Sequence, residues 1–224
     1  AGEIKKYIKG NPEAVLMVEF IDDDLDVARK KLKDLESLIK LDNQNNDFAA
    51  YEDLNDQKAV FEIRKAGLNI LMSMKGDRKG VAFIEDCAVT LENLADYTER
   101  LRDVFRKYNT EGLFYAHASV GTLHVRPILN AKSEQDIKNM KAIAKEAFTM
   151  VKEYKGSHSG EHGDGIVRSE FHEMMFGKKI VGAFEEIKDT FDPKGLLNPG
   201  KIVRAFKSDD RTLMRYKPDY KAEN

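Results

Sequence analysis

Short apolar runs rich in β-branched residues alternate along this chain with long segments of helical periodicity. The runs at 14–21, 81–86 and 114–130 predict strands, the last of them either bent or divided in two. Apolar residues recur at helical spacing in five further segments: 25–40, 51–73, 91–108, 133–155 and 178–191. This alternation predicts layers of helix and sheet, because helices of such length exclude an all-β fold. Periodicity alone does not decide between a parallel and an antiparallel sheet.

Four of the five histidines lie in two runs of small residues and glycine. The first run carries His117 and His124, and the second carries His158 and His162, with Glu161 directly before His162. Histidine is the commonest metal ligand and the side chain that titrates near neutral pH. Two imidazoles and one carboxylate, with open positions left, suit a divalent metal that polarises a substrate oxygen. The pattern therefore predicts a site for a metal or for proton transfer.

The seven-residue spacing of His117 and His124 conflicts with one unbroken strand. An odd separation places two side chains on opposite faces of a strand. Gly121 lies between them, where a bulge or tight turn would reset the alternation. Without such a reset, both histidines are better interpreted as half-buried hydrogen-bonding residues, and the sequence leaves this structural interpretation open.

Composition excludes several classes of function. The net charge of −2 gives no electrostatic reason to expect nucleic acid or an anionic membrane as a partner. The single cysteine, Cys87, excludes an internal disulfide and a cysteine-bound iron–sulfur cluster within this chain. Neither a long apolar stretch nor a signal-peptide pattern is present, so we expect a cytoplasmic protein, peripheral to a membrane only if a partner lies there.

Several motifs together resemble the C-terminal half of FAD-linked 2-hydroxyacid dehydrogenases of the vanillyl-alcohol-oxidase type, which act on D-lactate, glycolate or D-2-hydroxyglutarate. The motifs are His117-x6-His124, Ser-Gly-Glu161-His162-Gly-Asp-Gly, and Phe191-Asp-Pro-Lys-Gly-Leu-Leu-Asn-Pro-Gly-Lys201. The resemblance extends to large fused proteins with a FAD domain in front and an iron–sulfur domain behind. Those proteins are similar also in Glu62-Ile-Arg-Lys-Ala-Gly-Leu, Gly76-Asp-Arg-Lys and Arg211-Thr-Leu-Met-Arg-Tyr.

The resemblance implies an α+β fold with a duplicated, ferredoxin-like antiparallel sheet covered by helices. It implies oxidation of a D-2-hydroxy acid to the 2-oxo acid, with hydride passing to a FAD held mainly by a separate N-terminal domain. His117, His124 and Glu161 are implied to bind a divalent metal (Zn, Fe or Mn), and His162 to be the base. The ordinary pKa of histidine, about 6.5, suits that task.

The resemblance also implies further contacts with substrate and cofactor. Arg64 would pair with the 1-carboxylate through its planar, bidentate guanidinium. Asn198 would lie on a loop turning towards the flavin, and Glu161 is implied to bind the cofactor as well as the metal.

The chain departs from the commoner family pattern in two places. Relatives often carry a substrate-contacting lysine in the strand where Ile84 stands here, so Lys79 is the expected substitute. Arg126 replaces an asparagine, and we expect this fixed positive charge to recognise a second carboxylate, favouring a diacid such as 2-hydroxyglutarate over lactate.

The expected organisation is one substrate domain over residues 1–204, followed by a linker over 205–224. The chain begins without methionine, which fits a cut-out fragment or a trimmed natural start. As a fragment without its FAD domain, we expect it to bind no flavin tightly and to be inactive alone.

Two other classes of function stay open. One is a standalone metal-dependent hydrolase or lyase, and the other is a non-catalytic interaction domain with structural histidines. The sequence leaves open the metal, the acid, the electron acceptor, and whether the chain forms a homo-oligomer.

Overall fold

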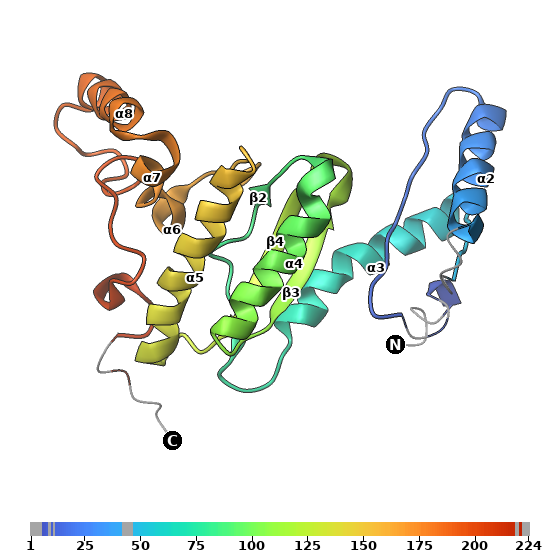
Figure 1. The fold of residues 1–224 in the computed structure, drawn as a ribbon, viewed down its shortest axis with the longest axis horizontal. Helices are drawn as coiled ribbons and strands as arrows, with labels where there is room; N and C mark the ends of the chain where they lie inside the picture. The colour runs from blue at the N-terminus through green and yellow to red at the C-terminus, as the bar shows by residue number, and fades with distance from the viewer. Residues whose placement is uncertain (1–5, 9, 11, 42–46, 218–219, 221–224) are drawn as a thin grey trace. The chain divides into compact units, whose positions relative to one another are not determined.

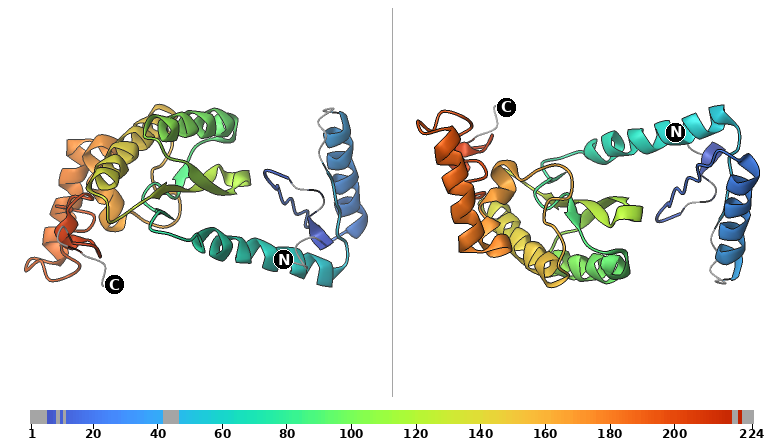
Figure 2. Two further views of the ribbon diagram at one scale, coloured as in Figure 1. Left: turned by 90° about the horizontal axis from the view of Figure 1, so that it is seen from below. Right: turned by 90° about the horizontal axis from the view of Figure 1, so that it is seen from above.

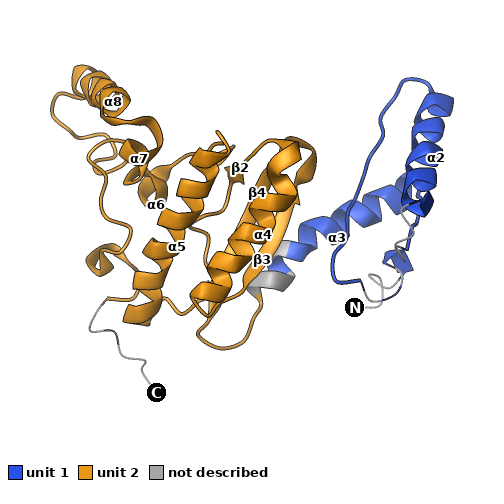
Figure 3. Cartoon of the chain, in the orientation of Figure 1, with its two compact units in different colours: residues 1–70 blue, residues 71–224 orange. Residues whose placement is uncertain are grey.

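The computed structural model describes residues 6–8, 10, 12–41, 47–217 and 220. The chain divides into two compact units, Ala1–Ile70 and Leu71–Asn224 (Figure 3). The boundary of the substrate domain at residue 204 stays a prediction. The described tail beyond it includes Ser208, whose N–H donates to Glu170 Oε1 over 2.8 Å, and the short 3-10 helix η2, Arg211–Leu213.

The first unit holds the helix α2, Leu25–Leu41, and most of α3, Leu54–Met72, both as predicted. The strand expected over 14–21 is wrong, because these residues form no ladder with the described part of the chain. Most of its apolar side chains lie exposed, with Leu16 at 76% and Ile21 at 81%. A strand needs a hydrogen-bonded neighbour, and the described residues provide none for this run.

The second unit is built around β4, Thr122–Leu129, which pairs antiparallel with three other strands. β3, Gly112–His117, lies along one edge of β4, and the short strands β1, Lys79–Gly80, and β2, Cys87–Ala88, share the other. The antiparallel sheet implied by the resemblance is therefore confirmed. Figure 1 shows this sheet beside the helices α4, Leu91–Lys107, and α5, Glu134–Glu153.

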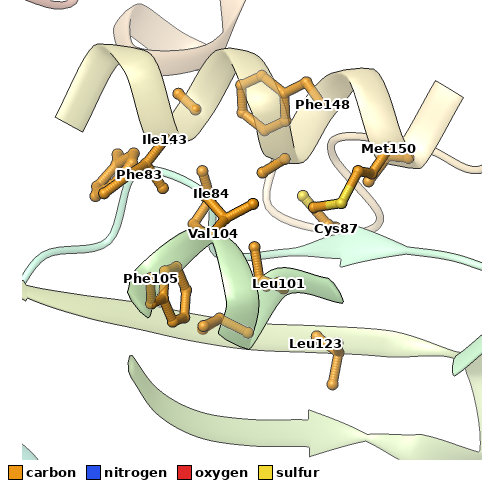
Figure 4. Close-up of a cluster of buried hydrophobic side chains, with 14 of the residues drawn as sticks. Phe83, Ile84, Cys87, Leu101, Val104, Phe105, Leu123, Ile143, Phe148 and Met150 are labelled. Atoms are coloured by element: carbon orange, nitrogen blue, oxygen red, sulfur yellow. The ribbon is translucent and has the colours of Figure 1, made fainter. Parts of the chain in front are cut away.

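The core lies between these two helices and one face of β4. Apolar residues alternate along β4, so that Leu123, Val125 and Leu129 are all at most 5% exposed. They pack with side chains of α4 and α5 that recur at helical spacing, including Leu101, Val104, Phe105, Ile143 and Phe148 (Figure 4). Figure 2 shows the two helices on one side of the sheet. The opposite face of β4, carrying His124 and Arg126, is left for other contacts.

The strand expected over 81–86 is also wrong. The ladders with β4 lie just before and just after this segment, at β1 and β2. Between these two ladders the chain turns and forms no strand. Phe83 and Ile84 are both buried, and Asp86 has a φ of 85°, which a strand does not allow. The apolar run therefore indicates that the segment is buried, and it does not indicate a strand.

The remaining helices follow the second histidine run. They are α6, Gly165–Ser169, α7, His172–Phe176, and α8, Lys178–Phe191. The turn after α8 is held by Asp192, which accepts from the N–H groups of Leu196 and Leu197 over 2.9 and 2.8 Å. The ammonium of Lys188, with these two N–H groups, lowers the pKa of Asp192 to about 2. Among the described residues, no helix is long and apolar enough to cross a membrane.

The β3–β4 connection resolves the awkward histidine spacing. A 3-10 turn over Ala118–Val120 ends at Gly121, whose φ is 71°. The hairpin register then pairs His117 with Thr122 and Tyr115 with His124. Because paired residues share a face and alternate residues of β4 do too, His117 and His124 lie on the same side. The predicted tight turn at Gly121 is confirmed.

Gly121→Ala is expected to lower the free energy of unfolding by about 3 kcal/mol, since left-handed backbone and overpacking add up. A Cβ on Gly121 would lie 1.9 Å from the carbonyl oxygen of Val89. Gly76→Ala is the matched control, because Gly76 has a φ of 88° but open space around it. Urea unfolding of both variants measures the difference. Equal destabilisation would contradict the close contact at Gly121.

Candidate active site

Glu161 Oε1 is the point on which three imidazoles converge. It lies 3.2 Å from His124 Nε2, 3.4 Å from His117 Nε2 and 3.7 Å from His162 Nε2. The two strand histidines come from the β3–β4 hairpin, and Glu161–His162 come from the loop between α5 and α6. The structure thus brings together all four residues predicted for the metal and the base.

Two of the rings form a stack. His162 lies over His124 with ring centroids 4.9 Å apart and an angle of 11° between their planes. The stack has a carboxylate on each side, Glu161 near the Nε2 atoms and Glu85 near the Nδ1 atoms. Glu85 Oε1 lies 3.9 Å from His124 Nδ1 and 3.8 Å from His162 Nδ1. His162 is 43% exposed, so a substrate can reach its ring.

His124 is the most buried member of the cluster, at 8% exposure. Burial lowers the pKa of His124, although the charge of Glu85 opposes this shift. The imidazole is therefore neutral at pH 7, which is the form that binds metals. Imidazole nitrogens that converge on one carboxylate oxygen can offer lone pairs to a cation, so the donor set of His117, His124 and Glu161 fits a divalent metal.

The loop that carries Glu161 and His162 is held by Asp86, which is fully buried. Its side chain accepts from the backbone N–H of Glu161 over 2.9 Å and of His162 over 2.8 Å. Burial alone would raise the pKa of Asp86, but these N–H donors hold it below its usual range. Ser159 Oγ lies 3.2 Å away and donates to the same carboxylate.

Glu85 and Asp86 contact the candidate site, and the sequence reasoning missed both. The sequence did contain a signal for them. Two acidic residues end the apolar run at 81–86, and a run of this kind is expected to be buried, where acidic residues are rare unless they are paired. Glu85 forms a two-pronged ion pair with Arg126, with Nε 2.6 Å from Oε2 and Nη2 3.1 Å from Oε1. Arg126 lies two residues from His124 on the same face of β4, and its charge is largely balanced by Glu85.

Lys79 and Asn198 make their contacts outside this cluster. Lys79 is paired with Leu129, five residues along β4 from His124, or about 17 Å at strand spacing. Its ammonium donates to the carbonyl of Met74. Asn198 lies exposed in the loop after α8 and accepts from Lys201 over 3.2 Å. Arg64 belongs to α3 in the first unit, so its relation to the histidines stays a prediction.

Comparison with known proteins finds one matching family, described as FAD linked oxidases, C-terminal domain, over residues 3–202. The D-2-hydroxyglutarate dehydrogenase of Haemophilus influenzae is 33% identical over 76% of this chain and 17% of its own length. The protein of the same name from Pseudomonas putida is 31% identical over 89% and 20%. The D-lactate dehydrogenase of Archaeoglobus fulgidus is 29% identical over 89% and 41%. The chain spans a fifth or less of the first two relatives.

Proposed function

The chain belongs to the family of FAD-linked oxidase C-terminal domains, and on that premise we propose that it is the substrate-binding and catalytic domain of a flavin-dependent dehydrogenase for a D-2-hydroxy acid. The observation that carries the proposal is the convergence of three imidazole Nε2 atoms on Glu161 Oε1. A cation held by these donors would keep positions open for the hydroxyl and carboxylate oxygens of a 2-hydroxy acid. Relatives named as D-2-hydroxyglutarate and D-lactate dehydrogenases support the same substrate class.

Each residue of the cluster has a role in this proposal. His117, His124 and Glu161 would hold the metal, which when bound lowers the pKa of the substrate hydroxyl. His162 takes the hydroxyl proton, because its ring is half-exposed and stacks on the buried ligand His124. A FAD held by a partner domain would supply the acceptor for the hydride of carbon 2. Proton and hydride thus leave together as the acid becomes a 2-oxo acid.

Further contacts in the proposal come from outside the cluster. Arg64 binds the substrate carboxylate at carbon 1, and Lys79 also contacts the substrate. The loop that carries Asn198 turns towards the flavin. Lys79 is the weakest of these assignments, because its position along β1 separates it from His124. The proposal also includes the duplicated ferredoxin-like sheet, the substrate domain over 1–204 with a linker over 205–224, and a fused iron–sulfur domain in the same protein.

The deciding experiment joins this chain to its FAD-binding domain and mixes the anaerobic protein with D-2-hydroxyglutarate, D-lactate or glycolate. We expect at least one acid to bleach the visible flavin absorption, and the L enantiomer of a chiral acid to leave it unchanged. Bleaching by none of them would contradict the proposal. The chain alone is expected to purify colourless and inactive; turnover with metal and without flavin would instead favour a metal-dependent hydrolase or lyase.

Arg126→Gln is expected to lower kcat/KM for D-2-hydroxyglutarate at least about tenfold, the cost of one charge-assisted hydrogen bond, and to change the value for D-lactate little. The reason is that Arg126 shares the face of His124 and would recognise the second carboxylate of a diacid. Since the variant leaves Glu85 without its ion pair, the double variant Glu85→Gln/Arg126→Gln is the control for lost packing. An equal loss for both acids would contradict this role.

A further inference from the structure

A second cluster of side chains that could bind a metal shares no residue with the candidate active site. His158 comes from the loop after α5, Asp164 directly precedes α6, and His172 begins α7. His158 Nε2 lies 3.2 Å from Asp164 Oδ1, and His172 Nε2 lies 3.1 Å from Asp164 Oδ2. Both imidazoles are buried, with His158 at 1% and His172 at 2% exposure.

The hydrogen bond of His172 determines where its lone pair points. Nδ1 lies 2.9 Å from the carbonyl oxygen of Ile202, and a carbonyl can only accept, so Nδ1 carries the proton. In the neutral ring Nε2 then has a lone pair, and this lone pair faces the carboxylate of Asp164. Two lone pairs at 3.1 Å repel each other unless a cation lies between them. That cation is either a proton on His172 or a metal ion.

His158 argues for the metal. Among the described residues, neither of its ring nitrogens has a hydrogen-bond partner of acceptable geometry. The ring is surrounded by Phe148 and Phe176, with centroids 5.3 and 5.6 Å away. A buried nitrogen without a partner costs about 1–3 kcal/mol, which coordination would offset.

We propose that His158, Asp164 and His172 bind one divalent transition metal of the zinc class, in a site separate from the His117–His124–Glu161 cluster. Two imidazoles and a carboxylate are a common zinc donor set. Ligands around one tetrahedral ion at about 2.0–2.1 Å lie about 3.3 Å apart, close to the separations seen here. The N–H of His172 to a backbone carbonyl is the outer-shell contact that orients metal-binding histidines.

The bound metal would stabilise the loop that carries the active-site residues. His158 and Asp164 are the two ends of the stretch that contains Glu161 and His162, and His172 also contacts the segment after α8 through Ile202. A metal that ties both ends to α7 restricts this loop without touching a substrate. The expected role is structural, and its readout is metal content and thermal stability.

The test uses the whole chain with His117→Ala/His124→Ala, which removes the first cluster and leaves the second. After dialysis against a zinc-buffered solution, we expect about one zinc per chain by plasma mass spectrometry. Adding His172→Ala should abolish this zinc, whereas adding His162→Gln, a matched loss of one histidine outside the second cluster, should not. Zinc-free protein in the His117→Ala/His124→Ala chain, with native circular dichroism, would overturn the proposal, as would retention of zinc after His172→Ala.

A second measurement covers the case in which His172→Ala fails to fold. Cobalt(II) added to the folded His117→Ala/His124→Ala chain should give the visible absorption of a four-coordinate ion, and Asp164→Asn should weaken it. Removing metal with a chelator should also lower the thermal unfolding midpoint. An unchanged midpoint without cobalt absorption would show that a protonated His172 pairs with Asp164 instead. Neither readout depends on flavin or substrate, so a failure of this proposal is separate from a failure of the proposed function.

Discussion

His162→Gln is expected to reduce kcat for oxidation of the preferred D-2-hydroxy acid by a factor of about 10²–10⁴, the usual contribution of a positioned base. Glutamine can still hydrogen-bond near Glu161 but cannot accept a proton at pH 7. The backbone N–H of His162 keeps its bond to Asp86 in the variant, so the loop should stay in place. Steady-state kinetics of the chain joined to its FAD-binding domain would measure the loss, with KM nearly unchanged.

Two further variants separate proton transfer from packing. His162→Phe keeps an aromatic ring stacked on His124 and should be as slow as His162→Gln. Added imidazole should restore part of the rate of His162→Gln, because a free base can enter the space near a half-exposed side chain. If His162→Phe retained the wild-type rate, His162 would not be the base, and the stacked ring itself would be what the reaction needs.

The long helices α4, α5 and α8 of the second unit could be predicted because their signals are local, whereas the five-residue helices α6 and α7 were not predicted. Ser133 accepts from the N–H of Asp136 at the start of α5, and apolar residues of α4 follow a period that any window of the sequence reveals. The strands β1 and β2 could not, since each has two residues and exists through hydrogen bonds to β4. Two residues are too few to show the alternation of apolar and polar side chains by which a strand is predicted from sequence.

The candidate site divides in the same way. The sequence could predict four members of the cluster, because histidine and glutamate are common metal ligands and proton acceptors: His117, His124, Glu161 and His162. Gly121 indicated the turn that places the first two on the same side. Asp86 could not be predicted, since it acts on backbone groups 75 and 76 residues later. A carboxylate that binds N–H groups has the same letter in the sequence as one that faces water. Only burial distinguishes the two, and burial belongs to the folded chain.

Asp86→Asn is therefore the most informative change outside the histidines. At pH 7 it is expected to lower the free energy of unfolding by about 3 kcal/mol, because an amide has one acceptor oxygen and turns N–H donors towards the N–H groups of Glu161 and His162. The same change should weaken metal binding and kcat/KM, since Glu161 and His162 lose their shared anchor. Circular dichroism during urea unfolding measures the stability, and Asp103→Asn, an exposed ion-paired carboxylate on α4, is the matched control, expected to cost at most about 1 kcal/mol.

The direction of the pKa shift of Asp86 determines how the stability lost in Asp86→Asn should vary with pH. The folded-state pKa of Asp86 lies below its usual value, so its charge stabilises the fold above the unfolded pKa of about 3.9. That stabilisation declines as pH falls below this value and through the folded-state pKa, where the carboxyl group becomes protonated. Asp86→Asn has no such titration, so the stability gap to wild type should be widest near neutral pH and narrow in acid. A gap that stays constant from pH 7 to below the folded-state pKa would mean that the lost stability comes from shape and not from the charge that holds the loop of Glu161 and His162.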